Sequence, residues 1–374
     1  MNNLISVIEF KKSQVKILIG YRLLKKIYVV YSDKSEEYPV TTNPTIEKER
    51  IFSYLSSKIY EIKNKYGEDI FSSLIVLFPN DGFSTVKVTG SVNTFDPSLL
   101  IVKSDYKNCV IDANKKVDVK DKVVLYDDPY VFFDDNNREF TSFPLGQRSD
   151  KLTFKGDAQL MDERRFNFYT SILEELSLSA KLSFFSSFAG HCFIRNQNCI
   201  NLEINDFQSD ISLIRDSHLI SSSSLPIGSK YAISEGKRLL KGDSSLFDKY
   251  ALQHGFLSDV IYDYKDKTSH SIREYNQALK DGFSLYLEKI YSEIEKMCSD
   301  SSVSVFLYGD ISKMTAVDTF FKNMLKRPVF CFESKVIGAR GGDFINCIGA
   351  INISSYPYIS LSEKKALNKY QLRG

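Results

Sequence analysis

The sequence predicts an α/β protein with two lobes, each of which has the element order βββαβ. Three short β-branched runs, an amphipathic helix and a buried strand open the chain, and the same order returns after residue 196. A length of 374 residues is enough for two to four compact units. We therefore expect two similar halves with a cleft between them.

Residues 1–80 form the first predicted half-unit. The runs LISVIEF, QVKILIG and KKIYVVYS are rich in β-branched residues and are separated by turns, as in an antiparallel meander. Apolar residues then recur at spacings of three and four between Ile51 and Ile62, which predicts an amphipathic helix that Gly67 ends. The run SSLIVLFP predicts a buried strand, which Pro79 closes.

Residues 81–160 differ in character and predict an inserted subdomain. Short strands are expected at STVKVTGSV, NCVIDA, KVVLYD, YVFFDD and KLTFKGDA, because acidic and amide turns and Pro129 separate these runs. A helix over MDERRFNFYTSILEELS and a strand over KLSFFSSFAGHCFI then return the chain to the first lobe, within residues 161–195.

The second lobe is expected over residues 196–240 and 301–355. Its strands are NCINLEIN, DISLIRDSHLISSSS and VSVFLYGD, with short helices over YAISEGKRLL and DTFFKNMLK. Residues 241–300 form a helical subdomain with a long helix from about Ser271 to Met297, and residues 356–374 form a tail. Two βββαβ halves around a cleft make up the actin/hexokinase/Hsp70 architecture.

Composition and charge exclude several classes of function. The formal net charge of +2, from 49 basic and 47 acidic residues, gives no electrostatic footprint for nucleic acid. The six cysteines form no CxxC pair, and the spacing of His191, Cys192 and Cys199 fits no common zinc pattern, so structural roles are expected. No run reaches the ~18 apolar residues of a membrane helix, and the N-terminus enters a strand directly. We expect a cytoplasmic protein.

The order of segments resembles FtsA, the actin-like bacterial division protein that links FtsZ filaments to the membrane. VIEFKKSQVK stands where that family has Asp-Ile-Gly-Thr-Thr-Lys-Val, and LEINDFQSDI stands where it has Asp-Ile-Gly-Gly-Gly-Thr-Thr-Asp-Ile. The passages EELSLSAKLSFFSSFAG, SSLPIGSKYAISEG, FDKYALQHG and VFLYGDISKM resemble further family segments in the same order. The resemblance spans nearly the whole chain and implies an actin-like fold with an FtsA-type insertion.

The resemblance also implies a nucleotide site. If ATP and Mg²⁺ binding is retained, the site residues are Glu9, Lys11, Lys12, Ser13, Glu203, Ser209, Asp210, Gly309 and Asp310, with Ala251 at the position of a purine-side lysine. Phosphate hairpins need glycine, because backbone N–H groups must reach the anion without side chains in the way.

Both phosphate hairpins have lost their glycines. Lys11, Lys12 and Ser13 replace Gly-Thr-Thr in the first, and the second has Asn205-Asp206-Phe207 instead of three glycines. Asp206 also brings a negative charge towards the place of the phosphates. The two turn lysines are expected to point into solvent; the alternative is that they supply compensating charge from the opposite hairpin. We expect weak or no ATP binding and no catalytic residue.

The implied function therefore lies in surfaces. In FtsA the subdomain with the long helix receives the FtsZ C-terminal tail, and here Arg273 and Lys280 lie seven residues apart on one face of that helix. The alternative is that they are exposed charges without a partner. The insertion implies self-association into a filament or dimer, with YVFFDD either an apolar contact strip or internal core.

The tail SEKKALNKYQLRG stands where FtsA carries an amphipathic membrane helix. Its apolar residues Leu367, Tyr370 and Leu372 are too few for firm anchoring alone, although contact with the membrane at the division site is implied. Two alternatives to a division scaffold stay open. One is an active actin-like ATPase or small-molecule kinase with Asp210 as its base, and the other is a pilus-assembly platform protein of the related actin-like type.

Overall fold

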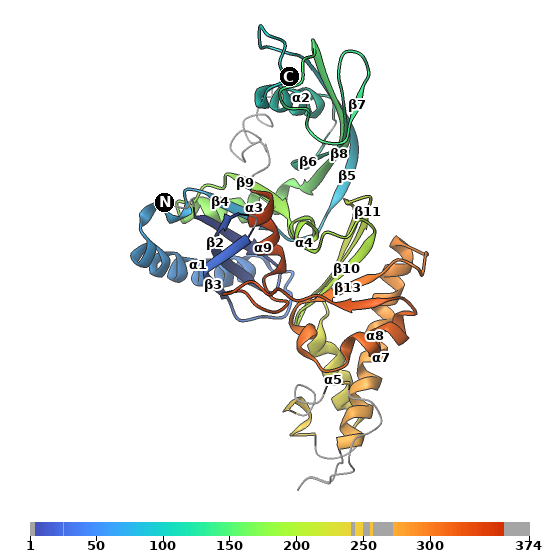
Figure 1. Cartoon of the computed structure of the whole chain (residues 1–374). Helices are drawn as coiled ribbons and strands as arrows, with labels where there is room; N and C mark the ends of the chain where they lie inside the picture. Colours follow the sequence, from blue (N-terminus) through green and yellow to red (C-terminus); the bar gives the residue numbers. More distant parts are fainter. Residues whose placement is uncertain are drawn as a thin grey trace.

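The computed structural model describes residues 4–24, 26–117, 119–240, 244–249, 255–256 and 272–354. Figure 1 shows two lobes side by side and a third unit that extends away from them. The strands are β1 (Ile5–Phe10), β2 (Val15–Leu23), β3 (Lys26–Lys34), β4 (Leu74–Phe78), β5 (Ser84–Asn93), β6 (Lys122–Phe133), β7 (Glu139–Phe140), β8 (Lys151–Asp162), β9 (Leu182–Phe185), β10 (Cys199–Ile204), β11 (Ser209–Arg215), β12 (His218–Leu225), β13 (Val305–Tyr308) and β14 (Val329–Cys331). The helices are α1 (Pro44–Tyr66), α2 (Lys103–Lys115), α3 (Glu163–Glu175), α4 (Ser186–Ile194), α5 (Ser229–Leu239), α7 (Ile272–Met297), α8 (Val317–Leu325) and α9 (Ile345–Ile353), with single 3₁₀ turns η1 (Glu68–Phe71) and η2 (Asp310–Lys313).

The two lobes contain sheets of the same topology. The first has the strand order β3-β2-β1-β4-β9 and the second the order β12-β11-β10-β13-β14. In each, three antiparallel strands form a meander and two further strands run parallel to the first of them. The predicted βββαβ half-unit is therefore present twice.

Local sequence signals define the first crossover helix. Asn43 caps α1 by accepting a hydrogen bond from Thr45 N, Pro44 occupies the first turn, and Gly67 ends the helix at φ 100°. The apolar residues spaced at three and four, among them Ile51, lie against the first sheet. The predicted helix is confirmed.

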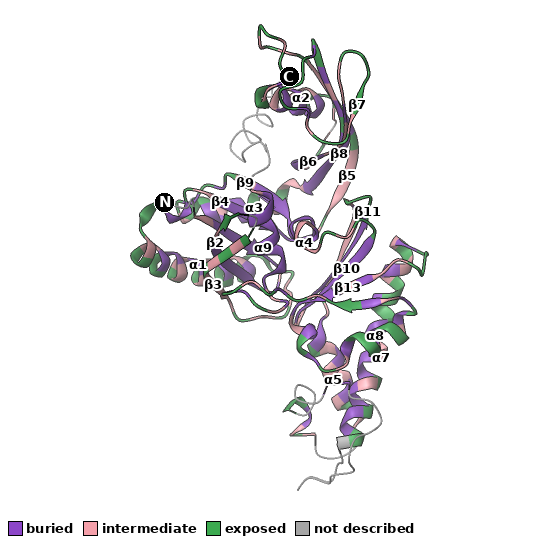
Figure 2. Ribbon diagram, viewed as in Figure 1, coloured by how far each residue is buried: buried purple, intermediate pink, exposed green. Residues whose placement is uncertain are grey.

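Each lobe has its own apolar core, and two helices join them. Figure 2 shows the buried residues concentrated in the two central sheets and the helices on them. Helix α4 contacts strands of both sheets and packs closely against α9. A Cβ on Gly349 would lie 1.8 Å from the Ala189 carbonyl oxygen, so this close crossing requires glycine there.

A third, four-stranded sheet interrupts the first lobe between β4 and β9. Its order is β5-β8-β6-β7, and α2 covers one side around a separate apolar core. The predicted strand NCVIDA is wrong, because this run lies inside α2. Tyr106, Cys109, Val110 and Ala113 are buried there at helical spacing, a pattern that extends beyond the six residues of the run.

Two other predicted strands have different boundaries. KVVLYD and YVFFDD form one strand, β6, with an irregular register at Pro129. Phe132 of that strand is buried in the core. Of the two alternatives for YVFFDD, internal core rather than contact strip is therefore correct at this residue. The run KLSFFSSFAGHCFI is strand only to Phe185, since Ser187 N donates to Asn80 Oδ1 at the end of β4 and the chain turns into α4.

The long helix α7 begins and ends within one residue of its prediction. Ala251, part of FDKYALQHG and the tail 355–374 lie outside the described residues. In the part of the chain that the structure describes, no helix is long and apolar enough to cross a membrane. Across the same residues no three His, Cys, Asp or Glu side chains are arranged to hold a metal ion.

Candidate functional site at the cleft between the lobes

Two equivalent β-hairpins face each other across the cleft. The first joins β1 to β2 through a turn closed by Lys11 N donating to Gln14 O at 2.9 Å. The second joins β10 to β11 and is closed by Asn205 N donating to Gln208 O at 3.0 Å. The cleft is therefore lined by two glycine-free turns, one from each lobe.

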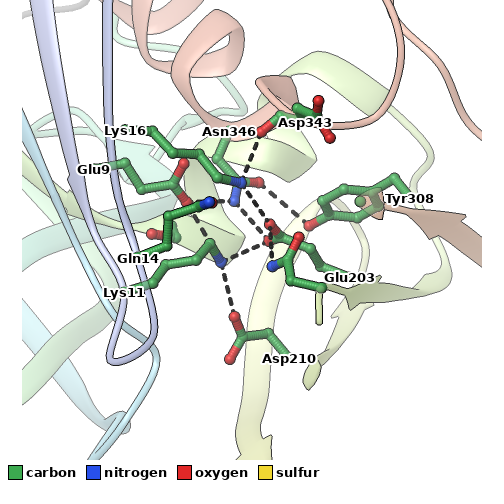
Figure 3. Close-up of polar contacts among 12 residues, drawn as sticks. Glu9, Lys11, Gln14, Lys16, Glu203, Asp210, Tyr308, Asp343 and Asn346 are labelled. Atoms are coloured by element: carbon green, nitrogen blue, oxygen red, sulfur yellow. Dashed lines mark hydrogen bonds and ion pairs between the residues drawn. The ribbon is translucent and has the colours of Figure 1, made fainter. Parts of the chain in front are cut away.

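The Lys11 side chain crosses from the first hairpin into the second. Its Nζ lies 2.8 Å from Glu203 Oε2 and 2.8 Å from Asp210 Oδ2, and 3.5 Å from Glu9 Oε1 of its own hairpin (Figure 3). The side chain is 0% exposed. The ammonium group donates hydrogen bonds to Glu203 and Asp210, and the ion pair with Glu9 brings a third carboxylate to it. The expectation that Lys11 points into solvent is wrong, and the alternative, compensating charge opposite the second hairpin, describes its position.

A second lysine and an amide complete the buried network. Lys16 Nζ lies 3.2 Å from Glu203 Oε1 and donates to the Asp343 carbonyl oxygen at 2.7 Å. Asn346, on α9, donates from Nδ2 to both Glu9 Oε1 and Glu203 Oε2, at 2.7 and 2.8 Å. The network thus joins both hairpins and the helix that runs between the lobes (Figure 3).

The charges in this network stabilise one another. Burial by itself lowers the pKa of Lys11, but the surrounding carboxylates, Asp210 and Glu203 most strongly, hold it well above its ordinary value. Burial also lowers the pKa of Lys16, but the surrounding carboxylates, Glu203 most strongly, raise it more, so the pKa of Lys16 lies above its ordinary value. Burial raises the pKa of Glu203, but Lys11 and Lys16 outweigh this and lower it to about 2. These three groups are charged at neutral pH.

Neutral donors also bind the carboxylates of the second hairpin. Gln208 Nε2 donates to both oxygens of Asp210, and Ser224 Oγ donates to Asp210 Oδ1 at 2.6 Å. Asn205 Nδ2 donates to Glu203 Oε1 at 3.2 Å. Groups of their own lobe, as well as Lys11, therefore hold these carboxylates in place.

A second set of ion pairs lies at the rim of the cleft. Lys34, from the first lobe, lies 3.1 Å from Asp310 Oδ1 and 3.6 Å from Asp343 Oδ2. Lys313 contacts the same two carboxylates at 2.7 and 3.1 Å. These side chains are partly exposed, so each pair contributes less than the buried network.

The second turn also occupies the N-terminus of α5. Asp206 Oδ1 accepts from Ser229 Oγ at 3.1 Å, and Asp206 Oδ2 lies 3.2 Å from Lys230 Nζ. The Asp206 carbonyl oxygen accepts from Lys230 N. A Cβ on Gly228 would lie 2.1 Å from the Asn205 carbonyl oxygen, so turn and helix are in direct contact. The carbonyl oxygens of the turn thus cap α5, and the negative charge of Asp206 lies beside the positive end of that helix.

ATP with Mg²⁺, which the fold implies, does not fit these residues. The three carboxylates that could neutralise a cation already surround the Lys11 ammonium. In the second hairpin, side chains replace the glycines that would expose N–H groups to phosphate. The carbonyl oxygens of the turn and the Asp206 carboxylate occupy a helix N-terminus that could otherwise receive an anion. The charged side chains of the two hairpins bind one another.

The other predicted site residues lie at the edge of the network or outside it. Lys12 lies 2.7 Å from Asp81 of its own lobe and is partly exposed. Ser13 is buried beneath the first turn. Ser209 Oγ donates to the Ile227 carbonyl oxygen and faces the hydroxyl of Tyr286 on α7, away from the cleft.

The predicted adenosine turn is tightly packed. Gly309 has φ 91° and precedes Asp310, which belongs to the rim. A Cβ on Gly342 would lie 2.6 Å from Gly309 N, so the chain leading into α9 lies directly on this turn. The turn keeps its glycine for a contact within the protein.

The predicted partner residues lie on α7. Arg273 is exposed and Lys280 is partly buried, one on each of two turns near the start of the helix. A helix advances about 100° per residue, so seven residues bring both side chains to nearly the same face.

Several site residues were missed by the sequence interpretation. Lys16 pairs with Glu9 in the β1–β2 register and is a lone charge between Val15 and Ile17, which indicates a buried partner. Asn346 is likewise a lone polar residue in an apolar run. Lys34, Lys313 and Asp343 carry no such signal, because none of them is a lone charge in an apolar run.

Comparison with known proteins assigns the fold. No protein-family model matches the sequence, and no curated protein matches it. Among solved structures, the PilM-PilN type IV pilus biogenesis complex is similar at TM-score 0.56 and 12% identity, over 96% of this chain and 99% of that one. Ethanolamine utilization protein EutJ from Carboxydothermus hydrogenoformans is similar at TM-score 0.53 and 8% identity, over 93% of this chain and 89% of that one. MreB 5 of Spiroplasma citri bound to AMPPNP is similar at 0.50 and 8%, over 99% of both chains. The chain has an actin-like α/β fold.

Proposed function

We propose that this chain is a nucleotide-independent scaffold with an actin-like fold, in which an internal ammonium group takes the place of a cation–nucleotide complex. One observation carries the proposal: Lys11 Nζ lies between three carboxylates, two of them from the opposite lobe, with a side chain that is 0% exposed. The chain supplies its own cation at the contact between its lobes.

The energetics of buried charges support this proposal. Three carboxylates close together repel one another and must be protonated or bind a cation. Lys11 and Lys16 provide two positive charges, and Asn346 and Gln208 provide neutral donors. Displacing the Lys11 ammonium would leave it buried without partners, at a cost of several kcal/mol. A nucleotide must meet this cost before it gains any contact.

We further propose that the scaffold is an FtsA-like division adaptor that receives the acidic C-terminal tail of FtsZ on α7. The exposed Arg273 and the partly buried Lys280 on one face support a contact with an acidic peptide. The inserted sheet provides a surface for self-association, and the tail beyond residue 354 a basic segment for the membrane. The scaffold function does not depend on which partner binds.

Titration calorimetry with two ligands tests both levels of the proposal. ATP·Mg²⁺ should give no saturable heat with the purified chain, whereas micromolar, Mg²⁺-dependent binding would overturn the scaffold proposal. A peptide of the FtsZ tail from the same organism should bind, and the double substitution Arg273→Glu/Lys280→Glu should weaken it about tenfold or more.

A matched control lies on the same helix. Lys289 and Lys296 are exposed, seven residues apart, and about 160° around the helix from the first pair. Lys289→Glu/Lys296→Glu makes the same change of charge and should leave tail binding unchanged. Equal weakening by both double variants would show only a general charge effect.

A pilus-assembly platform is the second candidate, because the pilus complex of PilM and PilN is similar over nearly all of both chains. At 12% identity this similarity extends to the fold alone. Affinity purification from the native cell separates the candidates. Recovery of FtsZ supports the division adaptor, and recovery of pilin-assembly proteins without FtsZ supports the platform.

A further inference from the structure

The hairpin between β2 and β3 presents two adjacent leucines to solvent. Leu23 is 43% exposed and Leu24 is 89% exposed. Strand β2 ends at Leu23 and β3 begins at Lys26, so the connection has two residues. Such turns favour Asn-Gly or Gly, whereas Leu24 occupies the left-handed region at φ 48°. Neither burial nor turn geometry accounts for a leucine at this position.

Basic residues flank the leucines. Arg22 and Lys26 are both exposed, and the sequence of the tip reads Arg-Leu-Leu-Lys-Lys. Arg22 Nη1 donates to the Asn352 carbonyl oxygen at 3.1 Å, a neutral partner. Among the described residues, neither Arg22 nor Lys26 has a carboxylate within ion-pair distance. The tip therefore combines protruding apolar side chains with uncompensated positive charge.

The tip lies at the end of the first lobe that is remote from the cleft. Strand β2 starts beside the turn at Lys11 and runs outward to Leu23. Helix α9 runs the same way, from Asn346 in the buried network to Asn352 beside Arg22. The 20 residues that follow Ser354 in the sequence contain Lys364, Lys365, Lys369 and Arg373 against the single acid Glu363. The exposed leucines and the end of α9 thus lie at one end of the lobe, and a basic stretch of sequence follows α9.

From this combination we propose that the β2–β3 hairpin inserts Leu23 and Leu24 into the surface of an anionic lipid bilayer. A bilayer is deformable and accepts protruding side chains, and its anionic headgroups attract the flanking cations. Two leucines and their flanking cations give weak, reversible binding. The proposal is independent of nucleotide binding and of the FtsZ contact.

Vesicle sedimentation with the full chain tests the proposal. The wild type should bind vesicles of phosphatidylglycerol and phosphatidylcholine more strongly than vesicles of phosphatidylcholine alone, and less strongly as salt is raised from about 0.05 M to about 0.5 M. Leu23→Asp/Leu24→Asp should lower the partition coefficient about tenfold or more. Phe95→Asp/Leu145→Asp, at two residues of the inserted subdomain that are 72% and 54% exposed, adds the same two negative charges. This matched control should bind as the wild type does.

A fluorescence measurement makes the result specific to the tip. The sequence contains no tryptophan, so Leu24→Trp introduces a single reporter. Its emission should shift to the blue on adding anionic vesicles and should be quenched by brominated lipid. Unchanged emission, or vesicle binding by Leu23→Asp/Leu24→Asp equal to that of the wild type, would overturn the proposal. A wild-type dimer that this double variant dissociates, seen by light scattering, would instead assign the tip to a second copy and also overturn it.

Discussion

The two cleft hairpins have the same place in two sheets of the same topology, yet they carry opposite charge. In each, the residue before the last of the first strand is a glutamate, Glu9 in β1 and Glu203 in β10. The residue across from Glu9 is Lys16, whereas the residue across from Glu203 is Asp210. With Lys11 added, the first hairpin is cationic and the second anionic. The repeated architecture thus places a cationic hairpin opposite an anionic one, and the two lobes bind each other through these charges.

Removing the cation from the first hairpin should break this complementarity and give the largest effect. Lys11→Met keeps the length of the side chain but leaves three carboxylates without their shared ammonium, and we expect a loss of about 3–5 kcal/mol in unfolding free energy. Urea denaturation followed by circular dichroism measures this change.

The neighbouring lysine provides the control. Lys12→Met makes the same substitution one residue away, at a partly exposed side chain paired only with Asp81 among the described residues. It should cost no more than about 1 kcal/mol. Equal losses for the two variants would mean that the turn as a whole, rather than the buried ammonium, holds the lobes together.

The elements of the fold were predictable because each has a local periodic pattern. The meanders, α1 and α7 alternate or repeat over more than one turn of structure, and their order defines the two halves. The strand predicted at NCVIDA failed because six residues are too few to separate period two from period 3.6. In KLSFFSSFAGHCFI the helix follows the strand without a break, since Ser187 N is bonded by Asn80.

The site was predictable only in part. The loss of glycine in both turns is visible in the sequence, and the resemblance to FtsA implied that Glu9, Lys11, Glu203 and Asp210 lie in one site. The destination of Lys11 was not visible, because its partners are 192 and 199 residues away and belong to the other lobe. A turn lysine points into solvent unless a second acidic hairpin faces it, and only the three-dimensional arrangement shows that it does.

Acid should sharpen the contrast between the hairpins. The pKa of Glu203 is lowered to about 2, so the stability it contributes is present above its ordinary value near 4.5 and is lost as pH falls towards 2. This loss amounts to as much as about 3 kcal/mol. The raised pKa of Lys11 gives stability that is fully present below 10.5 and is lost only as pH rises through its higher folded-state value.

One further carboxyl has a pKa that is raised instead of lowered. Glu37 Oε2 accepts a hydrogen bond from Asp206 N at 2.8 Å. Burial, with Asp310 and Asp206, raises the pKa of Glu37 to about 7, so stability should increase as pH falls from about 7 to 4.5. Thermal unfolding measured from about pH 8 down to about pH 2 follows both trends. Glu37→Gln should remove the rise near neutral pH and keep the loss below 4.5; a variant that keeps the rise would contradict this assignment.

The rim should give the smallest effect. Lys34 pairs with Asp310 and Asp343 across the cleft, but its side chain is 30% exposed and Lys313 contacts the same carboxylates. We expect Lys34→Met to cost about 0.5–1 kcal/mol and to lose most of that effect in about 0.5 M salt. Measuring both rim and Lys11 variants at low and high salt distinguishes the screened pairs from the buried network, whose contribution should change little with salt.

The distance between the lobes tests the central claim most directly. Spin labels at Tyr60→Cys on α1 and Tyr291→Cys on α7, in a Cys331→Ser background, report this distance by pulsed electron paramagnetic resonance, since both tyrosines and Cys331 are exposed. We expect one narrow distribution of label distances that is the same with and without ATP·Mg²⁺, and a broader distribution in Lys11→Met. A wild-type distance that changes on adding ATP·Mg²⁺ would contradict it.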